Sequence, residues 1–228
     1  MAWQSGYTLI AYNTKYVTDE ITSVSALWDP KYKGKIGMFG NASELGCVGL
    51  LAIGKDPATS TPDDWTAAAA KLEEQKPLVR AYYEQDYIKA LKSEDTWISM
   101  AWSGDIFQAG LQGYDTLKVA VAQEGVMFWT DNMLMPYTAS NPKDAMIYMD
   151  YVYDPKVQAV IEAYNNYVCP VPASKGIMAN DLHQPDVANS PLVFPDAAMI
   201  AASKNYYQWK DAQDLKTWND TFVPIYQG

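Results

Sequence analysis

The chain has 228 residues, of which 49% are hydrophobic and 13% aromatic, and its formal net charge is −10. This length and composition indicate one large domain or two small lobes with a substantial buried core, and they exclude a disordered chain. Nucleic-acid binding is not expected, because it requires a basic surface and Arg80 is the only arginine. One histidine and two cysteines are too few for a zinc site, and no glycine-rich phosphate-binding motif occurs, so we expect no metal and no cofactor.

Targeting signals are not recognisable in this sequence. No run approaches the roughly 18 apolar residues of a membrane span, and residues 1–6 lack the basic and apolar regions of a signal peptide. We therefore expect the chain as given to be either cytoplasmic or a part of a larger protein. The distance in sequence between Cys47 and Cys169 does not predict whether they form a disulfide.

Hydrophobic patterning predicts short strands that alternate with helices. Strands are expected at residues 7–13, 36–39, 82–83, 96–102, 117–122 and 128–135. Helices are expected at residues 25–29, 44–53, 62–75, 86–91, 105–110, 142–152, 155–165, 196–203 and 212–226. Thr61 is the expected cap of the third helix, and prolines begin this helix and the two at 142 and 155. The alternation predicts an α/β protein with a mainly parallel sheet.

Polar and aromatic side chains follow three of the predicted strands, where ligands bind in open α/β sheets. These candidate binding residues are Asn41, Glu44, Trp102, Ser103, Asp105, Phe128, Trp129 and Asp131. Carboxylates beside indole rings suit an organic ammonium ion, because the carboxylate accepts a charge-assisted hydrogen bond and the ring offers a cation–π face. The pattern therefore predicts a site for a small organic cation.

Each candidate also has a structural interpretation. The two tryptophans could be core residues, Glu44 could complement a helix dipole, and Asp105 could cap the helix that follows it. Asp131 is harder to explain in this way, because it lies in an apolar run and charged side chains are rarely buried without a partner.

Catalytic interpretations are less well supported. Ser103 lacks the Gly-x-Ser-x-Gly context of a hydrolase nucleophile, and His183, the base that a triad would need, lies in a predicted loop. A pair of carboxylates near tryptophans could form a glycoside hydrolase site, which is the enzyme alternative. The aromatic residues could also anchor a protein–protein interface.

The sequence resembles the spermidine/putrescine-binding proteins, which are the receptors of polyamine ABC transporters. The resemblance is carried by the run Trp-Asp-Pro-Lys-Tyr-Lys-Gly-Lys-Ile at 28–36 and by segments 102–105, 123–131, 139–145, 167–171 and 194–196. It implies a type II periplasmic-binding-protein fold with two lobes that close on the ligand, without catalysis. It also implies a periplasmic or extracellular location, membrane-associated in the full-length form, and a membrane permease as partner.

The same resemblance assigns roles to individual residues. Glu44 matches an acid that grips one ligand amine, and Asp131 matches a carboxylate that takes an ammonium group. Trp102 and Trp129 match aromatic walls of the site. Two departures leave the ligand open between putrescine, another amine and a different small solute. Asn41 stands where polyamine binders often carry an aspartate, and Tyr167 or Cys169 stands where a site tyrosine is often found.

Members of this family carry a further segment before the part that resembles this chain. We therefore expect mainly the second α/β lobe, at residues 9–128 and 179–228, plus the hinge and the returning part of the first lobe, at 1–8 and 129–178. A first lobe without its remaining partners exposes an apolar face, which predicts self-association through that face.

Overall fold

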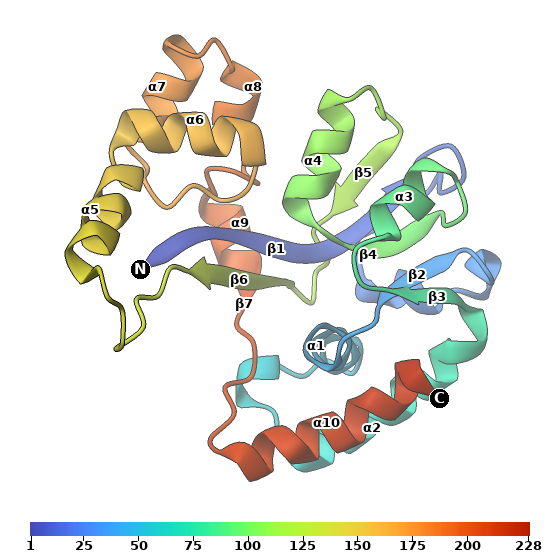
Figure 1. The fold of residues 1–228 in the computed structure, drawn as a ribbon. Coiled ribbons are helices and arrows are strands. Elements are labelled where there is room, and N and C mark those ends of the chain that lie inside the picture. Colours follow the sequence, from blue (N-terminus) through green and yellow to red (C-terminus); the bar gives the residue numbers. More distant parts are fainter. The chain divides into compact units, whose positions relative to one another are not determined.

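The computed structural model describes residues 1–228, which form two compact units (Figure 1). Unit 1 comprises Met1–Tyr7 and Trp129–Ala201, and unit 2 comprises Thr8–Phe128 and Ala202–Gly228. Two strands, β1 (Ala2–Asn13) and β6 (Val126–Asn132), carry the chain from one unit to the other. None of the helices combines the length and the apolar character needed to cross a membrane.

The sheet is mixed rather than mainly parallel. Its other strands are β2 (Ile36–Phe39), β3 (Val79–Tyr83), β4 (Ile98–Trp102), β5 (Leu117–Ala120) and β7 (Ser203–Lys204). The order is β3-β2-β4-β1-β6-β7, and β5 also pairs with β1. Strand β2 runs parallel to β3 and β4, whereas β1 runs antiparallel to β4 and β5. The prediction of a mainly parallel sheet is wrong because it assumed helical crossovers throughout, whereas β1 lies in the interior of the sheet and opposes its neighbours.

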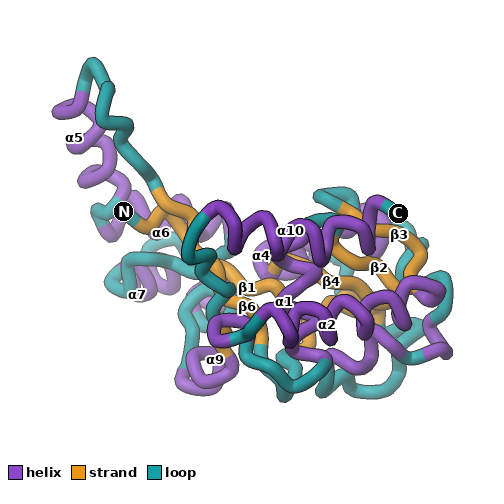
Figure 2. Tube along the Cα trace, turned by 90° about the horizontal axis from the view of Figure 1, so that it is seen from below, coloured by secondary structure: helices purple, strands orange, loops and turns teal.

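Helices cover both faces of the sheet in unit 2. Figures 1 and 2 show α1 (Ala42–Ala52), α2 (Pro62–Gln75) and α10 (Ala212–Gln227) together on one face. The shorter α3 (Tyr87–Lys92) and α4 (Ser103–Leu111) lie on the other. Trp65 and Trp218 are fully buried where α2 and α10 meet α1. Gly46 permits this close packing, because a Cβ there would lie 2.4 Å from the Trp218 ring.

The predicted helix starts at Pro62, Pro142 and Pro155 are confirmed. Thr61 caps α2 in a reciprocal capping box with Asp64, whose carboxylate accepts a 2.9 Å hydrogen bond from the Thr61 backbone N–H. The segment predicted as a helix at 25–29 is instead a 3₁₀ helix at Val24–Trp28. Further 3₁₀ turns are Pro30–Tyr32, Pro57–Thr59 and Lys76–Leu78.

Unit 1 is built mainly from helices. They are α5 (Pro142–Val152), α6 (Pro155–Asn165), α7 (Ser174–Asn180), α8 (Pro185–Ala188) and most of α9 (Ala197–Ala202). Residues 179–201, which the sequence analysis assigned to the second lobe, pack within this unit. Val187 and Val193 are buried here, and the Val193 carbonyl accepts a 3.0 Å hydrogen bond from the Cys169 backbone N–H. The proline-punctuated sequence carried no signal of this packing.

Candidate functional site

Glu44 is the buried acid at the centre of the candidate site in unit 2. Strand β2 ends at Phe39, and Asn41 then caps α1 by accepting a 2.9 Å hydrogen bond from the Glu44 backbone N–H. Glu44 is therefore the third residue of α1, where the helix dipole favours a negative charge. Only 8% of the residue is exposed. Glu44 can therefore both complement the dipole of α1 and be a candidate binding residue.

Three neutral side chains hold the Glu44 carboxylate. Thr8 Oγ1 donates to Oε1 at 3.0 Å, Tyr206 Oη donates to Oε2 at 2.8 Å, and Trp102 Nε1 lies 3.5 Å from Oε1. Burial raises the pKa of Glu44, and these three donors act in the opposite direction. The charge of the carboxylate itself is not matched by any ion pair with a lysine or arginine.

Thr8 and Tyr206 were missed by the sequence analysis. Thr8 is a polar residue inside the apolar run of β1, which is a weak signal of a buried polar partner. Tyr206 follows β7 and is 162 positions from Glu44, so no local pattern could have linked the two. Burial and the nearby Glu44 charge raise the pKa of Tyr206 well above its usual value, which keeps the phenol a donor.

Trp102 is held by an aromatic cluster. Its ring lies 5.0 Å from Phe39 and 5.8 Å from Tyr87, measured between ring centroids. Tyr87 Oη accepts a 3.2 Å hydrogen bond from the Trp102 backbone N–H and donates to the Asp105 carboxylate. Asp105 lies in the first turn of α4 and does not cap it, because Trp102 is the N-cap residue. Ser103 is fully buried at the start of α4.

Phe128 belongs to unit 2, and the remaining predicted binding residues, Trp129, Asp131 and Tyr167, belong to unit 1. The Trp129 and Tyr167 rings lie 5.3 Å apart at an angle of 58°. Gly6 leaves room for this pair, because a Cβ there would lie 2.4 Å from the Trp129 ring. Trp129 Nε1 is buried without a hydrogen-bond partner. Tyr167, rather than Cys169, is thus the residue beside Trp129, since the Cys169 thiol donates to the Val171 carbonyl at 3.3 Å.

Asp131 is exposed at the end of β6, so the expectation of a buried charge in an apolar run is wrong. The run ends one residue before it, because Thr130 is already exposed. Asp131 borders a surface hollow with Trp3, Asn132, Met133 and Tyr148. An exposed carboxylate needs no internal partner and remains available to a ligand.

Each unit therefore presents one carboxylate close in sequence or space to an indole ring. Unit 2 carries Glu44 with Trp102, and unit 1 carries Asp131 with Trp129 and Tyr167. No group of three or more His, Cys, Asp or Glu residues is arranged to hold a metal ion. Both cysteines are buried and free.

Known proteins similar to this chain are solute-binding proteins of transporters. A spermidine/putrescine-binding periplasmic protein of Salmonella typhimurium is 28% identical over 197 residues, which cover 86% of this chain and 55% of that protein. A putrescine-binding periplasmic protein of Escherichia coli is 28% identical over 158 residues, covering 67% of this chain and 41% of that protein. The chain thus spans about half the length of the curated relatives it matches.

Solved structures show the same fold. A structure from Listeria monocytogenes named for a spermidine/putrescine ABC transporter superposes with a TM-score of 0.87 at 22% identity, covering 99% of this chain and 68% of that chain. A spermidine/putrescine transporter substrate-binding protein from Streptococcus pneumoniae gives a TM-score of 0.84 at 21% identity, with the same coverage. The family model described as "Bacterial extracellular solute-binding protein" matches residues 1–203, and the chain belongs to this family of non-catalytic solute-binding proteins.

Proposed function

We propose that this chain is the solute-binding component of an ABC transporter and binds a polyamine such as putrescine or spermidine, or a similar organic cation. The observation that carries the proposal is the buried Glu44 carboxylate, which has neutral hydrogen-bond donors but no cationic partner. Burying a charge is costly unless a partner compensates for it. A ligand ammonium group next to Glu44 would supply the missing positive charge.

The aromatic residues support the same class of ligand. Trp102 Nε1 lies 3.5 Å from Glu44 Oε1, so a cation at Glu44 would also lie close to the Trp102 indole. We further propose that Trp129, Tyr167 and Asp131 are ligand-binding residues. Asn41, Ser103 and Asp105 are proposed to contribute mainly by supporting Glu44 and Trp102. In this proposal unit 2 is the second lobe of the family fold, and unit 1 contains the hinge and the returning part of the first lobe.

The proposed partner is the membrane permease of the transporter, and the proposed location is the periplasm or the cell exterior. Both rest on the family and on relatives that are named as periplasmic binding proteins. Within this function, the alternative ligand is a different small solute. It is suggested by Asn41, whose side-chain oxygen is engaged in capping α1.

Calorimetric titration of the 228-residue chain with putrescine and spermidine tests this function. Glucose and succinate serve as solutes without an ammonium group. Glu44→Gln keeps the shape of the side chain and removes its charge, so we expect it to lower amine affinity about 100-fold or more. Glu84→Gln is the matched control, because Glu84 is exposed. Tight binding of glucose or succinate, or equal amine affinity of the two variants, would contradict the proposal.

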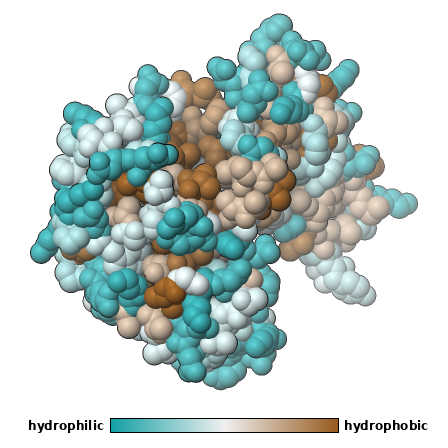
Figure 3. Space-filling view, turned by 180° about the vertical axis from the view of Figure 1, so that it is seen from behind, coloured by the Kyte–Doolittle hydropathy of each residue, from teal (hydrophilic) through white to brown (hydrophobic).

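We also propose that the chain self-associates through the exposed apolar side chains of α5 and the segment before it. Met146, Ile147, Tyr148 and Tyr151 on α5 are 58, 67, 56 and 60% exposed, and Leu134 is 80% exposed. Figure 3 shows the broader pattern, with hydrophobic residues lying among hydrophilic ones on the face presented. Several large apolar side chains exposed on one short helix are typical of a surface that is covered by a partner.

Light scattering on the eluting protein tests the self-association. We expect a mass above that of one chain, which Ile147→Lys returns to the monomer value by burying a charge in the interface. Gln85→Lys, which adds the same charge at an exposed residue of unit 2, is the control. A monomeric wild-type chain at all concentrations would refute this part of the proposal.

A further inference from the structure

Both oxygens of the Glu44 carboxylate are already engaged by the protein. Tyr206 Oη lies 2.8 Å from Oε2 and 3.2 Å from Thr8 Oγ1, while Thr8 Oγ1 lies 3.0 Å from Oε1. The two hydroxyls therefore lie next to each other and span the carboxylate from one oxygen to the other. Trp102 Nε1, at 3.5 Å from Oε1, is a further weak donor.

The occupied oxygens limit how a cation can be bound. An ionised carboxylate offers about four acceptor sites, and the three side chains take up to three of them. A guanidinium group binds a carboxylate best through two parallel N–H donors, one to each oxygen. An ammonium group is a compact charge whose donors act one at a time. The remaining acceptor capacity thus suits an ammonium group and disfavours the guanidinium fork.

We propose that Tyr206 is a specificity-determining residue, which makes the Glu44 site select alkylammonium ends over guanidinium ends of a ligand. This inference rests on the proposed function, because it assumes that Glu44 receives an organic cation. It goes beyond that function by naming the cationic group and the residue that chooses it. Thr8 acts in the same way on the other oxygen, with Tyr206 contributing the shorter bond.

Tyr206 packs at the margin of the hydrophobic core, with its hydroxyl on the Glu44 carboxylate. It follows β7 in a segment between two elements, and its side chain is partly buried. The next residue, Tyr207, is buried and donates to Asp214 at 2.8 Å, with its ring stacked on Trp218 at 5.8 Å. Tyr206 and Tyr207 are therefore a matched pair for mutation. The Tyr206 hydroxyl contacts Glu44, whereas the Tyr207 hydroxyl contacts Asp214.

The test compares putrescine with 1,4-diguanidinobutane, which has the same four-carbon spacer and a guanidinium at each end. Calorimetry on the 228-residue chain should give at least about tenfold tighter binding of putrescine, the effect of one charge-assisted hydrogen bond. Tyr206→Phe frees Oε2 and should reduce this preference about tenfold. Tyr207→Phe should leave the preference unchanged, and the melting temperature of each variant reports on its folding.

The outcomes separate this inference from the proposed function. Wild-type protein that binds both compounds equally, or Tyr206→Phe that weakens both by the same factor, would overturn the specificity role while amine binding stands. Wild-type protein that binds neither compound would overturn the proposed function and the inference with it. Should Tyr206→Phe fail to fold, Thr8→Val removes the donor to Oε1. The inference then requires a reduced preference in that variant, and an unchanged preference would overturn it.

Discussion

Two buried glutamates, Glu44 in unit 2 and Glu162 in unit 1, differ in the hydrogen-bond donors that surround their carboxyl groups. Neither forms an ion pair, and Glu44 is 8% exposed whereas Glu162 is fully buried. Glu44 has donors from three separate segments of the chain. The Glu162 side chain has one side-chain donor, Gln158 Nε2 at 3.0 Å, and its Oε2 has no partner.

The two carboxyl groups therefore differ in how many donors oppose the effect of burial on the pKa. Burial raises the pKa of Glu162 to about 8, and the hydrogen bonds from the Tyr167 backbone and from Gln158 only partly oppose this shift. Burial raises the pKa of Cys169 to about 11, and the nearby Glu162 acts in the same direction. Glu162 is therefore a neutral acid at neutral pH, and a buried carboxyl marks a cation site only where several donors converge on it.

The largest effect on stability is expected from Glu162→Gln, because the glutamine side chain resembles the protonated, neutral form of the glutamate. Because folding raises the pKa of Glu162 from 4.5 to about 8, its contribution to stability is fully present below about pH 4.5. It is lost progressively as the pH rises toward 8, which costs the wild type about 3 kcal/mol by neutral pH. Urea denaturation should show the variant more stable than wild type above neutral pH and equal to it in acid.

The exposed variant Glu84→Gln controls for the general loss of one negative charge from an acidic protein. A wild type and Glu162→Gln that unfold at the same urea concentration at every pH would show that Glu162 is ionised in the folded chain. The contrast between the two buried glutamates would then disappear.

A second prediction concerns the proposed ligand at Glu44. Burial raises the pKa of this carboxyl in the free protein, and a bound cation would lower it again. Binding therefore releases protons at acidic pH, so amine affinity should rise several-fold as the pH is raised from acidic to neutral. Calorimetry in two buffers of different ionisation enthalpy measures the released protons. Affinity that does not change with pH would show that the ligand avoids Glu44.

The sequence predicted the elements around Glu44 far better than the contacts that define its environment. The strand at 36–39, the helix after it and the capping of α2 follow from local residue patterns, and the structure has them at nearly the predicted positions. The donors Thr8 and Tyr206 come from opposite ends of the chain, so only the tertiary fold brings them to Glu44. The direction of β1 and the membership of residues 179–201 in unit 1 likewise depend on long-range packing.

The resemblance to the polyamine-binding proteins added information about site residues that local residue patterns do not contain. The strand ends had already given Glu44, Trp102, Trp129 and Asp131 as candidates, and the resemblance assigned a role to each of them and added Tyr167 or Cys169. The structure then adds which of them are held by neighbours, as with Trp102 against Phe39 and Tyr87. It gives Asp105 a partner in Tyr87, a contact that the spacing of the two residues did not suggest.

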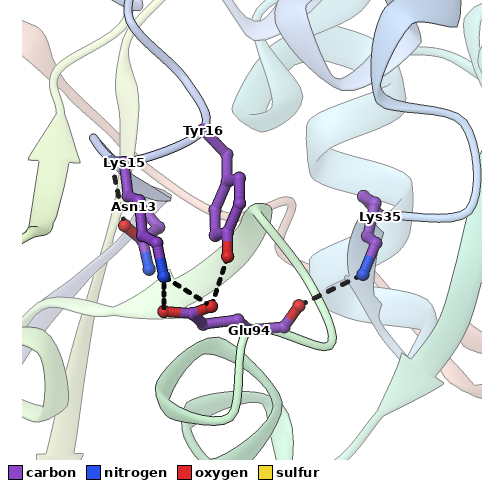
Figure 4. A network of polar contacts seen from close by, with 5 residues as sticks. All are labelled: Asn13, Lys15, Tyr16, Lys35 and Glu94. Carbon is purple, nitrogen blue, oxygen red and sulfur yellow. Dashed lines mark hydrogen bonds and ion pairs between the residues drawn. The ribbon is translucent and has the colours of Figure 1, made fainter.

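The smallest effect is expected at a third glutamate, Glu94, whose surroundings are opposite to those of Glu162. Figure 4 shows Lys15 and Tyr16 converging on its carboxylate, while Lys35 reaches its backbone carbonyl. The hydrogen bonds from Tyr16 and Lys15 lower the pKa of Glu94. Its contribution to stability is thus present above the unfolded pKa and lost as the pH falls, the reverse of Glu162.

Exposure makes this contribution small, since the Glu94 side chain is 38% and the Lys15 side chain 55% exposed. Glu94→Gln should therefore shift the urea midpoint slightly downward at neutral pH, and high salt should abolish the shift by screening the pair. Measuring Glu94→Gln and Glu162→Gln over the same pH series allows the shifts in the urea midpoint of the two variants to be compared directly. Shifts of the same sign would mean that total charge, rather than the surroundings of each carboxylate, governs how the glutamates of this chain affect its stability.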